Sequence, residues 1–68
     1  MRLRELRRAR NVTQVKLAMD LNMSQNTISR YETGDHEPGI AELIMLADYF
    51  HVSVDYLLER TDNPEINR

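Results

Sequence analysis

The sequence predicts an all-α domain of about five short helices, and three observations support this fold class. Apolar residues recur at helical spacing along most of the chain, residues that cap helices precede the apolar stretches, and no stretch alternates as a strand would. A chain of 68 residues forms one small domain, and such a domain buries only about 60% of the surface that its unfolded form exposes. Its core must therefore be compact and its helices short.

Apolar spacing and capping residues define the first two helices. The first, over residues 2–10, carries an apolar stripe of Leu3, Leu6 and Ala9. The second starts near Gln14, and Thr13 is its expected N-cap because a Thr side chain can accept a hydrogen bond from the first helical turn. Its stripe is Leu17, Ala18 and Leu21. Asn22 is expected to end this helix, because Asn adopts the left-handed conformation more readily than most residues.

The same signals predict three further helices. Ser24 is the expected N-cap of the third helix, and Gly34 ends it. The inward-facing residues around the turn between helices two and three are expected to be Leu17, Leu21, Met23, Ile28 and Tyr31. The fourth helix carries Ile40, Leu43, Ile44, Leu46, Ala47 and Phe50 at helical spacing. His51 is expected in its left-handed terminal position, and Ser53 caps a fifth helix with Val54, Leu57 and Leu58. Met19, Met45 and Tyr49 are expected in the core or partly in it.

The domain is predicted over residues 1–60, and residues 61–68, TDNPEINR, are predicted to be a tail or linker because they contain Pro and few apolar side chains. Zero cysteines exclude a disulfide scaffold and a thiolate zinc site, and two histidines are too few to suggest a metal centre. No apolar run approaches the roughly 20 residues of a membrane span. We therefore expect a cytoplasmic protein that is not an enzyme, with no cofactor, no metal, no membrane partner and no evident small-molecule substrate.

Charge is segregated along the chain. Residues 1–34 contain seven Lys and Arg against three Asp and Glu, whereas residues 35–68 contain two against eight. Such an asymmetry is typical of a polyanion-binding face with an acidic back. The alternative is that solvated helix faces differ in sign by chance. The same alternative applies to the Arg-rich first helix, which is either a solvated face or a phosphate-contacting one.

One stretch, LNMSQNTISRYETG over residues 21–34, is unusually free of carboxylates for an acidic chain. From Asn22 to Tyr31 it contains no acid, and Arg30 is its only cation. The residues that face outward at the start of the third helix are Gln25, Asn26, Thr27, Ser29 and Arg30. Amides suit adenine and a guanidinium suits guanine in the major groove, where a carboxylate would approach phosphate. This composition predicts a helix that reads DNA, whereas the plainer interpretation is polar surface at a helix start.

The chain resembles the Cro and lambda-repressor-like, or Xre-type, helix-turn-helix transcriptional regulators over about residues 1–60. The resemblance rests on VTQVKLAMDLNMSQNTISRYETG followed by EPGIAELIMLADYFHVSVDYLL. It implies a compact five-helix lambda-repressor-like DNA-binding domain with its helix-turn-helix at helices two and three. The implied base-contacting residues are Gln25, Asn26, Arg30 and Ser29, and the implied backbone-contacting residues are Gln14, Thr27, Thr33 and Gly34. Lys16 is also predicted to contact the DNA backbone. Three places depart from the family pattern, namely Asn22 for the usual Gly, Lys16 for the usual acid, and Asp35 with His36 where many relatives carry basic residues.

The resemblance further implies a partly buried ion pair between Arg7 and Glu32 and a homodimer on a palindromic double-stranded DNA operator. Candidate dimer residues are Ala41, Met45, Tyr49, Tyr56 and those near Glu59. The function implied is that of a sequence-specific transcriptional regulator, expected to be a repressor. The alternative is a helix-turn-helix scaffold used as a protein-interaction module, as in an antitoxin or an accessory domain. Steep salt dependence of binding to duplex DNA distinguishes the two.

Overall fold

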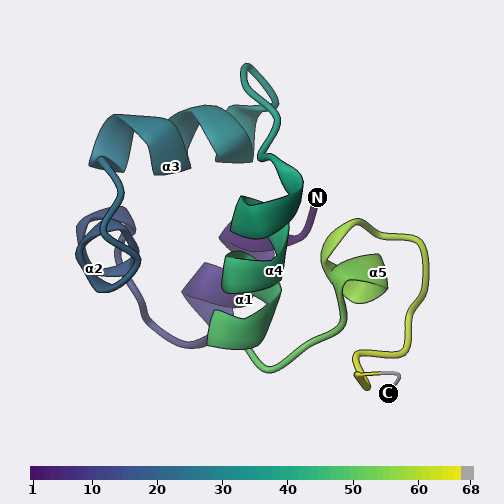
Figure 1. Cartoon of the computed structure of the whole chain (residues 1–68). Helices are drawn as coiled ribbons and strands as arrows, with labels where there is room; N and C mark the ends of the chain where they lie inside the picture. Colours follow the sequence, from purple (N-terminus) through teal and green to yellow (C-terminus); the bar gives the residue numbers. More distant parts are fainter. Residues whose placement is uncertain (67–68) are drawn as a thin grey trace. The chain divides into compact units, whose positions relative to one another are not determined.

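The computed structural model describes residues 1–66 and is all-α over this range (Figure 1). Its helices are α1 (Leu3–Ala9), α2 (Gln14–Asp20), α3 (Gln25–Thr33), α4 (Ile40–Tyr49) and α5 (Val54–Leu57). The predicted fold class is confirmed. The last two residues of the predicted tail, 67–68, lie outside the described residues. The chain divides into two units, one formed by residues 3–37 with α1 to α3, the other by residues 1–2 and the segment from residue 38 onward with α4 and α5.

Side-chain caps start three of the helices where the sequence predicts them. The hydroxyl groups of Thr13, Ser24 and Ser53 each accept a 3.0 Å hydrogen bond from a backbone N–H in the first turn of α2, α3 and α5. Each cap satisfies a donor that has no partner inside the helix. Helix α4 begins differently, because Gly39 occupies its N-cap position and makes no side-chain hydrogen bond.

Four helices end in the same left-handed turn. Asn11, Asn22, His51 and Glu59 have φ of 56°, 56°, 55° and 64°. In each case the next N–H donates to the carbonyl five residues earlier, as in the bond of 2.8 Å from Met23 N to Ala18 O. This is the Schellman arrangement, which satisfies carbonyls that the helix end would leave unpaired. The turns at Asn22 and His51 confirm the sequence prediction, and those at Asn11 and Glu59 were not predicted.

In the first unit, α2 and α3 pack against each other and α1 packs against α3. The buried apolar residues from these helices are Leu3, Leu17, Ala18, Ile28 and Tyr31. Leu6, Leu21 and Met23 are half-buried, and Ala9 is exposed. The expectation that Met19 belongs to the core is wrong, because its side chain is 74% exposed. One residue along a helix turns the side chain by about 100°, which carries Met19 off the face that Leu17 and Ala18 bury.

In the second unit, α4 packs against α5. Its buried apolar residues are Leu46, Ala47, Phe50, Val52 and Leu57. Core placement of Ile40 and Ile44 is wrong, since they are 80% and 48% exposed, and Leu58 at the end of α5 is also exposed. Burial on α4 is concentrated in its C-terminal half, next to the left-handed turn at His51. Val52 was not singled out from the sequence because it lies in a connection rather than on a helix.

Arg2 joins the start of the second unit to its end. Its Nε donates to Tyr56 O at 2.9 Å and its Nη2 to Thr61 O at 3.1 Å and Asp62 Oδ1 at 3.0 Å. The guanidinium carbon also lies 4.4 Å from the centroid of the Tyr56 ring, a cation–π distance. Ser53 N donates to Pro64 O at 3.0 Å. Residues 61–64 therefore fold back on α5. The Arg2 side chain is 16% exposed, and its contacts stabilise the second unit.

Candidate nucleic-acid interface

The exposed face of α3 carries the four predicted base-contacting residues. Gln25, Asn26 and Arg30 are exposed and Ser29 is half-buried. Residues 26 and 30 are one helical turn apart and share a face, and residues 25 and 29 are their neighbours on it. These residues therefore lie on one side of α3, over its first six positions; Figure 1 shows where this helix lies in the chain. Amide, hydroxyl and guanidinium groups at this surface can donate to or accept from base edges.

Helix α3 does contain a carboxylate, Glu32, but it points inward. Its side chain is 0% exposed. Arg7 binds it through two nitrogens, with Nε 2.7 Å from Oε2 and Nη2 3.1 Å from Oε1. Arg4 Nε and Gln14 Nε2 donate to the same Oε1 at 3.2 and 3.1 Å. One buried carboxylate therefore links α1, the start of α2 and α3.

Arg7 also holds the connection between α1 and α2. Its Nη1 donates to Val12 O at 2.9 Å, and its side chain is only 12% exposed. Arg4 was not singled out from the sequence as a partner of Glu32. The available signal was its position three residues before Arg7, which places both side chains on one face of α1. Apart from Arg7, the arginines of the predicted first helix were interpreted as one solvated or phosphate-contacting face, and Arg4 is instead bound to Glu32.

The ion pair changes the protonation equilibria of both partners. Burial raises the pKa of Glu32, but hydrogen bonds from Arg7, Gln14 and Arg4 and the attraction of Arg7 lower it by more, so that the pKa lies below its ordinary 4.5. The hydrogen bond to Glu32 raises the pKa of Arg7 above its ordinary value, against the opposing effect of burial. Glu32 is therefore ionised at neutral pH. Its two oxygens are occupied by four N–H donors, which suits a structural role.

The predicted backbone-contacting residues lie in the first turns of α2 and α3 and at the end of α3, and each already has a partner or a fixed conformation. Lys16 Nζ lies 2.9 Å from Asp20 Oδ1. The hydroxyl of Thr27 shares a 2.8 Å hydrogen bond with that of Ser24. Thr33 Oγ1 donates to Arg30 O at 3.2 Å, and Gly34 ends α3 with φ of 82°. Gln14 differs from the rest because its amide contacts Glu32.

Lys16 and Asp20 form an exposed i, i+4 pair, with side chains 63% and 30% exposed. Exposed pairs of this kind contribute about 0.3–0.5 kcal/mol. A phosphate can therefore replace Asp20 as the partner of Lys16 at little cost. Arg30 has a comparable exposed partner, since its Nε lies 3.0 Å from Asp35 Oδ2. Asp35 was noted in the sequence, but its contact with Arg30 was not predicted.

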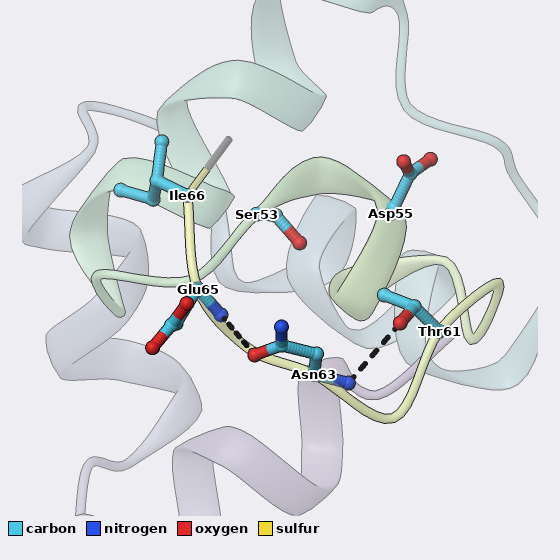
Figure 2. A pocket seen from close by; sticks show the side chains of 6 residues that line it. All are labelled: Ser53, Asp55, Thr61, Asn63, Glu65 and Ile66. Carbon is cyan, nitrogen blue, oxygen red and sulfur yellow. Dashed lines mark hydrogen bonds between the residues drawn. The ribbon is translucent and has the colours of Figure 1, made fainter. Parts of the chain in front are cut away.

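The second unit has a hollow of about 300 Å³ beside α5 (Figure 2). It is lined by Ser53, Asp55, Thr61, Asn63, Glu65 and Ile66. Figure 2 shows that Asn63 N donates to Thr61 Oγ1 and Glu65 N to Asn63 Oδ1, each at 3.1 Å, so the polar side chains there close turns.

Among the described residues, no three His, Cys, Asp or Glu side chains are grouped to hold a metal. In residues 1–66, none of the helices is both long and apolar enough to cross a membrane.

Comparisons with known proteins place this geometry in context. A model of the helix-turn-helix family matches residues 3–57. The uncharacterized HTH-type transcriptional regulator YobD of Bacillus subtilis is 38% identical over 64 residues, which cover 94% of this chain and 57% of that protein. HTH-type transcriptional regulator ImmR of Bacillus subtilis is 36% identical over 61 residues, covering 90% and 48%. The cryptic phage CTXphi transcriptional repressor RstR of Vibrio cholerae is 34% identical over 59 residues, covering 87% and 53%.

The chain spans about half the length of these three curated relatives. The match with the family model includes all of α1 to α5. No solved structure matches the chain with significance.

Proposed function

The chain belongs to the helix-turn-helix family, and on that premise we propose that it binds double-stranded DNA in a sequence-specific manner and regulates transcription, with α3 lying in the major groove. One observation carries the proposal. The exposed face of α3 presents neutral donors and acceptors with Arg30, while its one carboxylate, Glu32, is buried and bound to two guanidinium groups. A helix built this way brings hydrogen-bonding groups to base edges and keeps negative charge away from phosphate.

The proposed base-contacting residues divide by chemistry. Asn26 or Gln25 would pair with adenine through an amide, and Arg30 with guanine through its guanidinium, each good bidentate contact providing about 1–3 kcal/mol of discrimination. Ser29 lies on the same surface as a further donor or acceptor. These contacts would set the preferred sequence.

The proposed backbone-contacting residues are Gln14, Lys16, Thr27, Thr33 and Gly34. Phosphate contacts fix the position of the protein and carry no sequence information directly. Losing one should therefore weaken binding to every duplex alike. Gln14 has two roles in this proposal, because its amide also contacts Glu32 and so supports α3 from the side of α2.

We further propose a homodimer on a palindromic operator. One helix-turn-helix touches few bases, and such domains usually bind two half-sites about 10 base pairs apart or a multiple of that. In α4, Ala41 and Met45 are exposed and Tyr49 is half-buried; in and after α5, Tyr56 is half-buried and Glu59 is exposed. These five residues are the candidate contact surface. Of them, Tyr56 already contacts Arg2 through its ring.

We propose that the protein is a cytoplasmic repressor. A dimer bound to an operator can block transcription simply by occupying that DNA. The relatives bear names of both kinds, since RstR is a transcriptional repressor and BcrR of Enterococcus faecalis, 37% identical over 57 residues, is a transcriptional activator. Residues 1–60 are the proposed DNA-binding domain.

The test is the affinity of the chain for duplexes selected from a random library, measured against random duplex over a range of salt concentrations. We expect preference for the selected sequence and a steep fall in affinity with salt, with log K falling by about 0.9 per log unit of salt for each phosphate neutralised. Lys16→Ala should reduce this slope by about one. Arg60→Ala is the matched control, because Arg60 is an exposed cation beyond α5 and its substitution should leave the slope unchanged.

Two results would overturn the proposal. Equal affinity for every duplex would exclude sequence-specific binding. Absence of binding even at low salt would exclude DNA altogether and favour the protein-interaction module.

A further inference from the structure

We propose that Asp35 determines specificity by orienting Arg30, so that the guanidinium meets the DNA with its two terminal nitrogens and prefers guanine more strongly. This inference rests on the proposed function, because it assigns a positioning residue to the same surface. Asp35 stands in the turn after α3 and replaces the basic residues that the family resemblance led us to expect there. A carboxylate at a DNA-binding surface weakens binding to phosphate, so its presence calls for an explanation.

The contact uses only one edge of the guanidinium. Arg30 Nε lies 3.0 Å from Asp35 Oδ2. This is the one contact that the Arg30 side chain makes among the described residues. Its Nη1 and Nη2 are therefore left for a ligand. Guanine presents O6 and N7 as two adjacent acceptors in the major groove, which an Arg fork can bind with two parallel hydrogen bonds.

The turn itself fixes the position of Asp35. Before it, Gly34 adopts φ of 82°, a left-handed conformation that Gly tolerates best. After it, His36 N donates to Arg30 O at 3.2 Å, and the His36 ring stacks on Tyr31 with centroids 5.7 Å apart and planes 10° apart. Tyr31 is buried in the first unit. Asp35 thus lies between Gly34 and His36, whose conformations are fixed, and its carboxylate contacts Arg30.

Holding Arg30 before DNA arrives has a physical advantage. A free Arg side chain loses rotamer freedom when it binds, and prior fixation reduces that loss. The orientation that the ion pair favours also suits a base whose acceptors match the two terminal nitrogens. The negative charge of Asp35 meanwhile repels phosphate on every sequence. Asp35 therefore lowers overall affinity and raises preference at one base pair.

The experiment compares Asp35→Asn with the wild-type chain on the selected operator, on operators changed at the guanine that Arg30 reads, and on random duplex. Asp35 is exposed at the surface, so the substitution should leave the melting temperature nearly unchanged. We expect Asp35→Asn to bind random duplex more tightly and to lose preference at that base pair by about two- to fivefold, the scale of an exposed ion pair.

Glu37→Gln is the matched control. It removes the same charge two residues further along, and Glu37 is exposed and makes no ion pair or side-chain hydrogen bond among the described residues. It should raise affinity for all duplexes slightly and leave base preference unchanged. The second arm repeats Asp35→Asn in an Arg30→Ala background, where the substitution should no longer affect preference at that base pair, because the two residues act as one unit.

The outcomes separate this inference from the function on which it rests. If the wild-type chain prefers the operator and Arg30→Ala removes preference at one base pair, but Asp35→Asn leaves or increases that preference, Asp35 only repels phosphate and the inference is wrong. An equal effect of Asp35→Asn with and without Arg30 also contradicts it. If the wild-type chain shows no sequence preference, the proposed function itself fails and the role of Asp35 fails with it.

Discussion

At the scale of single residues, Glu32 combines two tasks. Its side chain is fully buried and accepts hydrogen bonds from Arg4, Arg7 and Gln14, so it joins three helices. The same inward orientation removes a negative charge from the outer face of α3. A carboxylate that stabilises the fold therefore adds no negative charge to the exposed face of α3.

Substitution of either partner of this pair should destabilise the domain. Arg7→Ala or Glu32→Ala leaves the other charge buried without its main partner, which costs roughly 3 kcal/mol, at the lower end of the range for buried pairs. That is a large share of the stability of a small domain. Arg8→Ala is the control, because Arg8 is exposed on the same helix and its loss should change the free energy of unfolding by less than about 0.5 kcal/mol. Chemical denaturation measures all three, and equal midpoints for Arg7→Ala and wild type would show that the pair is not structural.

The lowered pKa of Glu32 predicts a pH dependence. Because the folded pKa lies below the ordinary 4.5, the unfolded chain binds a proton more readily as the pH falls. The stabilisation is complete above the unfolded pKa and is lost as the pH falls through the folded one. The melting temperature of wild type should thus exceed that of Glu32→Gln most at neutral pH, and the gap should narrow below about pH 4.5. A gap that stays constant from pH 7 to pH 3 would contradict the assignment.

At the scale of helices, the ends of the elements show what a sequence can reveal. Ser and Thr accept hydrogen bonds at helix starts, and Asn tolerates the left-handed conformation. The caps at Thr13 and Ser24 and the turn at Asn22 were therefore predictable from residue identity and spacing alone. Glu59 has no such preference, and its left-handed conformation follows from how α5 meets the next segment. The spacing of apolar residues identified the apolar face of each helix but not which part of that face would be buried, so the core placement of Ile40 was wrong.

The candidate site was predictable to a similar degree. The composition of α3 indicated the outward residues, since a missing carboxylate is visible in the sequence itself. Which acid meets which arginine depends on turn geometry and packing, which a sequence does not display. Arg4 on Glu32 and Asp35 on Arg30 therefore appeared only in the structure.

His51 offers a test of the helix-end geometry. A non-Gly residue in the left-handed region costs about 1–2 kcal/mol. Substitution by Gly removes this cost, but the gain is smaller because Gly loses more conformational freedom on folding. His51, with φ of 55°, is exposed, so His51→Gly should raise the free energy of unfolding by roughly 0.5–1 kcal/mol. His51→Ala keeps the Cβ atom and should give no such gain. Denaturant midpoints measure both, and equal effects of Gly and Ala would contradict a conformational origin.

At the scale of the whole molecule, the charge pattern of the sequence overstates the positive charge available to DNA. Residues 1–34 carry seven cations, yet Arg2 is bound to Asp62 and both Arg4 and Arg7 are bound to Glu32. These pairs serve the fold. Phosphate contacts must therefore come from other groups, among which Lys16 stands at the proposed surface with an exposed, replaceable partner.

The proposed homodimer is tested by the mass of the complex. Light scattering should show two chains on one palindromic duplex, and Met45→Glu should weaken this assembly because it places a charge on the candidate contact surface of α4, where Met45 is 39% exposed. Asp48→Asn changes an exposed residue of the same helix and should leave assembly intact. A monomer both free and on the palindrome would contradict the dimer.

The central claim is that α3 reads bases, and the most direct measurement compares Arg30→Ala and Asn26→Ala with wild type on the selected operator, on its single-base variants and on random duplex. Each substitution should abolish preference at one defined base pair per half-site, at a cost of about 1–3 kcal/mol on the operator, while affinity for random duplex changes far less. An equal loss on every sequence would contradict base reading and leave these residues as backbone contacts.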